Sequence, residues 1–226
     1  MRSIATVIPH GVSPHPTLSR FTGEGIGNPS PLGRETGRAQ YFLVVGRVDK
    51  KKNLEVVIDA FSESRIQNPE SRLIFAGPFG YQAKEIVEHA QKTIAKIRKS
   101  NIRTEVELPQ PIEFLGTVTD AELASLYAGA TALLHPCPVE GFGLPVIEAM
   151  AVGTPVVVAD AGAAREAAGE AALRVPPYDA EAWARAMDRV SDAAVRDDLI
   201  SKGRQRAAQF TWERAAQETW RVLTPS

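Results

Sequence analysis

The amino-acid sequence predicts a doubly wound α/β domain, in which a parallel six-stranded sheet lies between two layers of helices in a Rossmann-like arrangement. Two patterns indicate this fold. Six short apolar runs alternate with segments of helical periodicity, and the apolar runs carry no polar face. A strand without a polar face must be covered on both sides, which is typical of parallel sheets flanked by helices. Ligands of such sheets bind at the carboxyl ends of the strands, so we expect the functional site there.

Each predicted strand is a run of mainly apolar residues next to a loop signal. Tyr41-Phe-Leu-Val-Val45 is the clearest, because it is continuous and is followed at once by Gly46. The six strands are expected at residues 41–45, 72–76, 112–115, 131–135, 155–159 and 171–175.

The helices are predicted from apolar spacing and from capping residues. Asn53 is expected to cap a helix whose apolar positions 54, 57, 58 and 61 form one stripe. Thr119 and Glu122 form a capping box, in which the hydroxyl and the carboxylate each satisfy a free backbone amide. Further helices are expected over residues 82–100, from 144, from 179, over 193–208 and from 211.

Residues 9–40 differ from the rest of the chain, because they are rich in proline and glycine and have little apolar periodicity. This composition predicts a linker over residues 1–40 and one domain over residues 41–226. A chain of 226 residues is long enough to bury one substantial core.

The composition limits the partners and the compartment. With 26 Lys and Arg against 27 Asp and Glu, the formal net charge is -1, so no bulk positive field attracts nucleic acid or an anionic membrane. No stretch reaches the roughly 20 apolar residues of a membrane span. The single cysteine, Cys137, cannot form an intramolecular disulfide, and we therefore expect a cytoplasmic setting.

Three segments follow predicted strand ends and could share one crevice. The first holds Arg47 and Lys52 at a strand-to-helix turn, where cations and free backbone amides favour an anion such as phosphate. The second runs from Glu140 to Glu148, and its glycines let a ligand approach the backbone. The third is residues 162–166. Taken singly, a solvated lysine loop and glutamates at a helix start are the plain structural alternatives.

In this order and separation, the three segments resemble the nucleotide-sugar-binding C-terminal domain of the group 1, or family 4, glycosyltransferases, which have the two-domain GT-B fold. The most specific part is Glu140-Gly-Phe-Gly-Leu-Pro-Val-Ile-Glu148, which has the family's two glutamates separated by seven residues. The resemblance covers residues 41–223. Residues 7–12 are similar to the interdomain segment that precedes this domain in the family, so the predicted linker would be of the interdomain type.

The resemblance implies a role for each candidate residue. Arg47 and Lys52 would hold the donor's diphosphate and stabilise the negative charge that develops as the glycosidic bond breaks. Glu140 would face the sugar, which makes it, with the two cations, a catalytic candidate. Glu148 would accept hydrogen bonds from the ribose hydroxyls, and Glu166 would contact the ribose or base side. Backbone contacts to sugar or phosphate would come from Gly141, Phe142, Gly143 and Leu144.

The same resemblance implies a retaining transfer of a sugar from a nucleoside diphosphate donor, without a metal ion or other cofactor. The sequence has no Asp-x-Asp, the diphosphate metal clamp of the other large glycosyltransferase fold. Family frequency suggests GDP-mannose as donor and polysaccharide biosynthesis as the setting. An N-terminal acceptor-binding domain would be needed in cis or in trans, and any peripheral membrane association would run through that domain.

Other functions fit parts of the pattern. A non-catalytic nucleotide-sugar-binding module and a GT-B nucleotide-sugar epimerase would use the same crevice, and both stay open as alternatives. A glycosidase pair of Glu140 and Glu148 fits less well, because the adjacent cations suit a leaving phosphate, which needs no protonation. His135 and Cys137 are fewer ligands than a zinc site requires, so no metal site is predicted.

Overall fold

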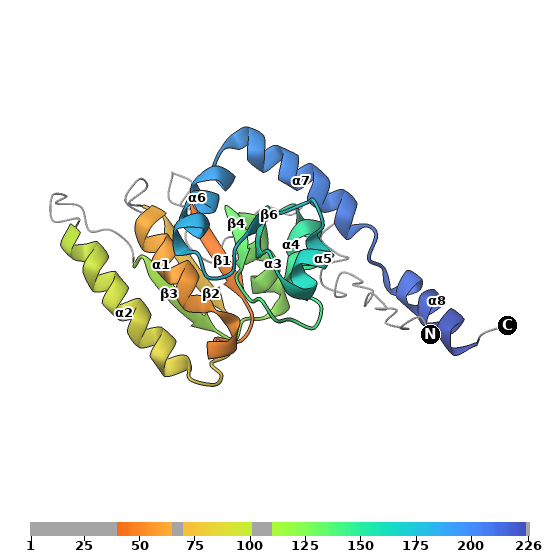
Figure 1. Ribbon diagram of the computed structural model, residues 1–226, viewed down its shortest axis with the longest axis horizontal. Helices are drawn as coiled ribbons and strands as arrows, with labels where there is room; N and C mark the ends of the chain where they lie inside the picture. The colour runs from red at the N-terminus through yellow and green to blue at the C-terminus, as the bar shows by residue number, and fades with distance from the viewer. Residues whose placement is uncertain (1–39, 65–69, 101–109, 225–226) are drawn as a thin grey trace.

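The computed structural model describes residues 40–64, 70–100 and 110–224, which form a three-layer α/β domain around one sheet (Figure 1). The described strand pairs are all parallel, in the order β3-β2-β1-β4-β5-β6. The doubly wound six-stranded sheet predicted from the sequence is therefore confirmed. Its strands are β1 (Tyr41–Val45), β2 (Arg72–Ala76), β3 (Ile112–Gly116), β4 (Ala132–His135), β5 (Val156–Ala159) and β6 (Leu173–Val175).

The helices begin and end close to the bounds expected from capping and periodicity. The predicted capping box is present, because the amide of Glu122 donates to the Thr119 hydroxyl at 3.3 Å and the amide of Thr119 donates to the Glu122 carboxylate at 2.7 Å. The helices are α1 (Leu54–Ser64), α2 (Ala83–Ser100), α3 (Asp120–Gly129), α4 (Leu144–Val152), α5 (Gly162–Ala168), α6 (Ala180–Val190), α7 (Ala193–Ala207) and α8 (Trp212–Leu223), with a short 3-10 helix η1 (Lys50–Lys52) before α1.

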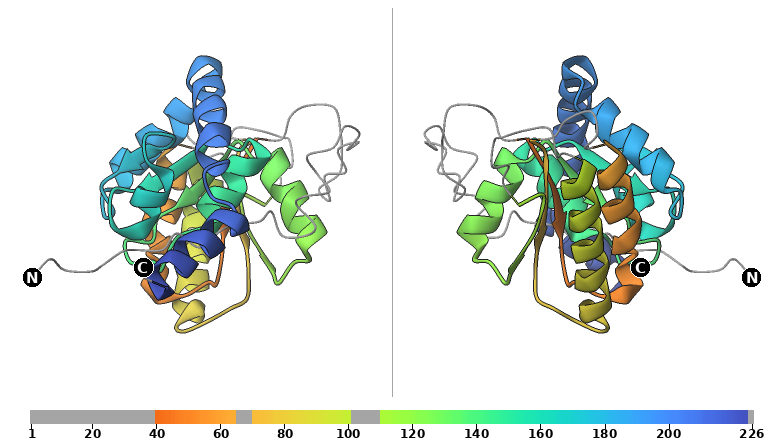
Figure 2. Two further views of the ribbon diagram at one scale, coloured as in Figure 1. Left: turned by 90° about the vertical axis from the view of Figure 1, so that its right-hand side faces the viewer. Right: turned by 90° about the vertical axis from the view of Figure 1, so that its left-hand side faces the viewer.

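Different helices cover the two faces of the sheet, as the end-on views of Figure 2 show. Alternate residues of β1 point to opposite faces. Phe42 and Val44 belong to a core cluster with α1, α2 and α6, whereas Tyr41 and Leu43 belong to a cluster with α3, α4 and α5. All four side chains are buried. A central strand that packs against both layers must be apolar at every position, which accounts for its continuous apolar run.

The strand order reverses between β1 and β4. The chain runs outward from β1 to β2 and β3, then returns to the other side of β1 through β4. The connections that leave β1 and β4 consequently lead away in opposite directions. A crevice at the carboxyl ends of these two strands is the place where this fold class binds ligands.

The role predicted for Asn53 as the side-chain cap of α1 is wrong. Its side-chain nitrogen instead donates to the backbone oxygens of Pro136, at 3.3 Å, and Pro177, at 2.7 Å. The backbone of Asn53 is left-handed, with φ of 56°, a conformation that asparagine adopts more readily than most residues. Asn53 thus ties the start of α1 to the loops that follow β4 and β6.

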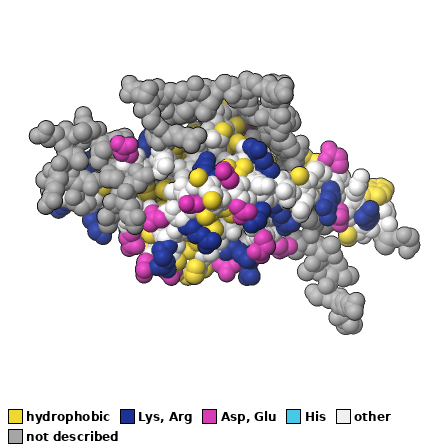
Figure 3. All heavy atoms as spheres, turned by 90° about the horizontal axis from the view of Figure 1, so that it is seen from above, with side chains coloured by type: hydrophobic (Ala, Val, Ile, Leu, Met, Phe, Trp, Pro, Cys, Tyr) yellow, Lys and Arg dark blue, Asp and Glu magenta, His cyan; other side chains and the backbone are white. Residues whose placement is uncertain are grey.

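The predicted linker, residues 1–40, lies outside the described residues except for Gln40. Within the described ranges, no helix combines the length and the apolar character needed to cross a membrane. On the face shown in Figure 3, basic and acidic side chains are interspersed, which fits the near-zero net charge.

The loop after β1 is fixed by backbone hydrogen bonds to the loop after β2. The amide of Gly46 donates to the oxygen of Ala76, and the amide of Val48 donates to the oxygen of Pro78, both at 2.9 Å. Gly77 makes this approach possible: its φ is +147°, and a Cβ atom there would lie 2.1 Å from the Gly46 oxygen. The position of the Arg47 segment therefore depends on a glycine in the neighbouring loop.

We expect Gly77→Ala to lower the free energy of unfolding by about 2–4 kcal/mol, because alanine is strained at this φ and its Cβ collides with backbone. Urea denaturation followed by circular dichroism measures the change. Gly141→Ala is the matched control, since a Cβ atom at Gly141 meets nothing within 4 Å. Equal stability of the two variants would contradict the packing described for Gly77.

Candidate functional site

A small recess opens at the carboxyl ends of β1 and β4. We call it the β1–β4 recess. It is lined by the end of β1, the buried end of β4 and four polar residues, which are Arg47, Lys52, His135 and Glu140. Two of the three predicted segments therefore meet where the strand order reverses, as expected from the fold class.

Lys52 and Glu140 form an ion pair across the recess, although 88 residues separate them in the chain. Lys52 ends η1, and Glu140 lies in the loop between β4 and α4. Their side chains are 30% and 18% exposed, so water screens the pair less than a fully exposed one. The structure thus brings together the two residues that the sequence analysis assigned to phosphate and sugar, and it pairs them with each other.

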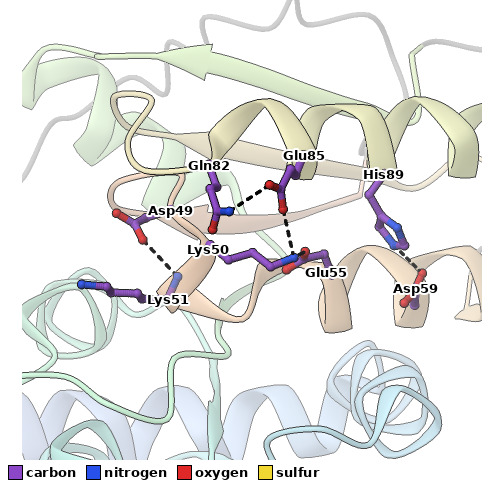
Figure 4. Close-up of polar contacts among 8 residues, drawn as sticks. All are labelled: Asp49, Lys50, Lys51, Glu55, Asp59, Gln82, Glu85 and His89. Carbon is purple, nitrogen blue, oxygen red and sulfur yellow. Dashed lines mark hydrogen bonds and ion pairs between the residues drawn. The ribbon is translucent and has the colours of Figure 1, made fainter.

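The other two lysines of the run Lys50 to Lys52 are directed elsewhere (Figure 4). Lys50 bridges α1 and α2 through ion pairs with Glu55 and, at 3.6 Å, with Glu85. Hydrogen bonding to Glu55 raises the pKa of Lys50. The side chain of Lys51 is exposed and does not line the β1–β4 recess. Of the three consecutive cations, Lys52 is therefore the one placed to meet a ligand there.

Arg47 lines the same recess from the segment that the β2 loop fixes. Its aliphatic stem lies against Gly80, where a Cβ atom would be 2.4 Å from the Arg47 Cδ. Nearby Asp49 caps η1 by accepting a hydrogen bond from the Lys51 amide at 3.0 Å, and this bond lowers the pKa of Asp49. Backbone geometry therefore holds Arg47 at the recess.

His135 is the last residue of β4 and is only 4% exposed. Its Nε2 atom has no hydrogen-bond partner among the described residues and lies 3.6 Å from the Glu140 Oε1 atom. Burial lowers the pKa of His135 to about 4, an effect that Lys52 strengthens and Glu140 opposes. The imidazole is therefore neutral at pH 7. The sequence pattern presents His135 only as one of too few zinc ligands, and it gives no signal of the position beside Glu140.

Cys137 stabilises the loop that carries Glu140. Its thiol is buried, donates to the Val139 oxygen at 3.1 Å, and has a pKa raised mainly by burial. A thiol with a raised pKa is a poor nucleophile. Within the described ranges, no three side chains of the metal-ligating types lie close enough to hold a metal ion.

The second glutamate of the motif, Glu148, lies in α4 and does not line the β1–β4 recess. Its carboxylate accepts a hydrogen bond at 2.9 Å from the hydroxyl of Tyr127, a fully buried residue of α3. Burial and the adjacent carboxylate raise the pKa of Tyr127 well above its usual range. Tyr127 fixes the orientation of Glu148, a role that the sequence pattern did not indicate.

The segment from Gly141 to Leu144 leads into α4. Gly143 has a φ of +87°, and a Cβ atom there would lie 3.1 Å from Ala164 of α5. A Cβ atom on Gly162 would lie 2.5 Å from the Pro138 oxygen. The start of α5 therefore packs against the glutamate loop, so the predicted proximity of the second and third segments is confirmed.

Phe142 and Glu166 line a separate recess, together with residues of α5, α7 and the start of α8. Phe142 packs edge-to-face against Phe210 at a ring separation of 5.6 Å. The Glu166 side chain is exposed, and its backbone oxygen accepts a hydrogen bond from Arg206 at 2.9 Å. Glu166 thus lines this recess rather than the one that holds Arg47, Lys52 and Glu140.

Comparisons with known proteins converge on one family. The family described as "Glycosyl transferases group 1" matches residues 33–206. O-antigen chain mannosyltransferase B of Escherichia coli is 30% identical over 184 residues, which are 79% of this chain and 44% of that protein. A D-inositol 3-phosphate glycosyltransferase of Nocardioides is 32% identical over 213 residues, covering 87% of this chain and 46% of that protein. The chain thus spans less than half the length of these curated relatives.

Solved structures show the same fold. HepE of Anabaena in complex with UDP and glucose has a TM-score of 0.68 at 22% identity, over 82% of this chain and 48% of that one. A sucrose-phosphate synthase of Thermosynechococcus elongatus has a TM-score of 0.67 at 25% identity, over 96% of this chain and 49% of that one.

Proposed function

Because this chain belongs to the group 1 glycosyl transferases, we propose that it forms the donor-binding domain of such an enzyme and binds a nucleoside diphosphate sugar at the β1–β4 recess. The observation that carries the proposal is that Arg47, Lys52 and Glu140 meet in this recess at the reversal of the strand order. The mannosyltransferase name of the Escherichia coli relative favours a mannose donor such as GDP-mannose, and the HepE complex with UDP and glucose supports a nucleotide-sugar ligand. A cytoplasmic setting belongs to the proposal.

The diphosphate of the donor would lie between Arg47 and Lys52. When the bond between sugar and phosphate breaks, negative charge grows on the terminal phosphate, and fixed cations lower the barrier by stabilising it. Arg47 is held by backbone geometry, whereas Lys52 is already bound to Glu140. Donor binding therefore requires Lys52 to exchange part of its contact with Glu140 for a phosphate oxygen.

The two glutamates would then act at opposite ends of the donor. Glu140, which shares the recess with the cations, would face the sugar. Glu148, whose carboxylate is oriented by Tyr127, would accept hydrogen bonds from the ribose hydroxyls. Transfer with retention of anomeric configuration and an acceptor-binding domain supplied in cis or in trans complete the proposal. Sugar transfer by the assembled enzyme, with the product anomer assigned by NMR, distinguishes it from a non-catalytic module and from an epimerase.

Arg47→Ala and Lys52→Ala should each weaken binding of UDP-glucose or GDP-mannose by about 1.5–3 kcal/mol, or roughly 10- to 150-fold, because each variant removes a charge-assisted phosphate contact. Isothermal titration calorimetry of the 226-residue chain measures the change. Lys51→Ala is the matched control, since Lys51 is an exposed neighbour of the same charge and does not line the recess. Equal losses for Lys51→Ala and Lys52→Ala would reject the assignment of the site.

Donor binding should need no divalent metal, because two side-chain cations already face the proposed diphosphate position. The dissociation constant in excess chelator should equal that in magnesium or manganese within about twofold. A large loss of affinity in chelator that is restored by either metal would show that the phosphate site has been misassigned.

Glu140→Gln should strengthen binding of UDP and GDP about two- to fivefold, because Lys52 no longer has a carboxylate competing with phosphate. These nucleotides lack the sugar that Glu140 is proposed to face. In the assembled enzyme, the same variant should suppress sugar transfer. Glu55→Gln is the control, since it removes the partner of Lys50 outside the recess and should leave affinity unchanged. Weaker binding of UDP and GDP by Glu140→Gln would contradict competition for Lys52.

A further inference from the structure

The buried imidazole of His135 has a place in the site that the proposed roles do not use. It ends β4, the strand that leads to Glu140, and its Nε2 atom is the one of its atoms directed toward that carboxylate. The 3.6 Å separation between Nε2 and Glu140 Oε1 is less than 1 Å longer than an N–H···O hydrogen bond. Within the described ranges, Nε2 is a buried polar atom without a hydrogen-bond partner. A buried polar atom without a partner destabilises the state in which it occurs, and a state that supplies a partner removes that cost.

The partner of Glu140 in this structure is Lys52, and it acts on the same oxygen, Oε1, that faces His135. Both charged groups are less than one-third exposed. If Lys52 turns to a diphosphate, Glu140 loses its counter-charge while it remains mostly buried, and the anionic ligand adds repulsion. Burying an unpaired carboxylate is costly, so another donor must replace Lys52.

We infer that His135 is a positioning residue that replaces Lys52 as the hydrogen-bond donor to Glu140 when the diphosphate of a donor binds. This inference rests on the proposed function of the recess. In the free protein, Lys52 pairs with Glu140, and the Nε2 atom of His135 has no hydrogen-bond partner among the described residues. In the bound protein, Lys52 contacts phosphate and His135 Nε2–H donates to Glu140. The carboxylate that faces the sugar keeps a fixed orientation throughout the exchange.

The exchange has an electrostatic consequence. In the free protein, Lys52 and burial oppose protonation of His135, and Glu140 favours it. When Lys52 leaves Glu140, the positive charge that opposes protonation of His135 moves away, and the negative charge of Glu140 that favours it remains. The pKa of His135 should therefore rise from about 4 on donor binding. Because the bound state then takes up a proton, donor affinity should increase as the pH falls through the pKa of the bound form.

The test is an NMR titration of the His135 imidazole from pH 4 to 8, with and without UDP-glucose or GDP-mannose, whose esterified diphosphates do not titrate in this range. The chain has four histidines, and a triple variant with His10→Gln, His15→Gln and His89→Gln leaves His135 as the single imidazole signal. We expect the midpoint of His135 to rise by about one pH unit or more in the donor complex. One contrary result is that the donor binds wild type, loses affinity in Arg47→Ala, and still leaves the His135 midpoint of wild type unchanged. That result would overturn the inference and leave the proposed function standing. Absence of binding by either sugar nucleotide would overturn both.

Two variants separate positioning from a merely structural role. In Glu140→Gln, no carboxylate remains to favour the protonated imidazole, so donor binding should raise the midpoint of His135 less than it does in the wild type. His135→Gln keeps an amide donor but cannot titrate, and it should bind donor with the wild-type affinity at pH 8 and without the gain at low pH. His135→Leu has no donor and should lower sugar transfer by the assembled enzyme more than His135→Gln does. Equal pH profiles of affinity for wild type and His135→Gln would contradict the inference.

Discussion

The ion pair between Lys52 and Glu140 is the contact on which the arrangement of the candidate site depends. Lys52 follows β1 and Glu140 follows β4, so the pair joins the two halves of the sheet where the strand order reverses. If either side chain turns away, the other is left as an unpaired and mostly buried charge. Under the proposed function, a donor that enters the recess would present its diphosphate to Lys52 and leave Glu140 in need of another partner.

The two cations of the site are held in different ways, and this difference suits them to different tasks. Arg47 lies on a segment whose backbone is fixed by hydrogen bonds and by the close approach of Gly46 and Gly77, and its side chain is exposed. Lys52 is held by a side-chain partner, the Glu140 carboxylate. Under the proposed function, Arg47 would mark the position of the diphosphate, and Lys52 would turn to it on binding. The loops that support both are joined by Asn53 to the loops after β4 and β6.

The fold and the meeting of Arg47, Lys52 and Glu140 in one recess could be predicted because they depend on local patterns and on one topological rule. Continuous apolar runs identify strands buried on both faces, and parallel strands bring Arg47, Lys52 and Glu140 to one edge of the sheet. The contacts of Asn53, Tyr127 and His135 could not be predicted, because each depends on the direction of a side chain relative to a loop distant in sequence. The lysine run by itself does not separate Lys52 from its two neighbours, and only the family resemblance singled Lys52 out.

The tryptophans of this chain occupy two distinct environments. Trp183 is fully buried in the cluster with α1 and α6, whereas Trp212 and Trp220 of α8 are 52% and 67% exposed. Indole emission shifts to shorter wavelength in an apolar interior and is quenched by solutes such as acrylamide only where they can reach the ring. The fluorescence of the native protein is therefore a sum of a blue-shifted, protected component from Trp183 and a red-shifted, quenchable component from α8. Collisional quenching can follow a change in the environment of α8 while Trp183 reports on the integrity of the core in the same sample.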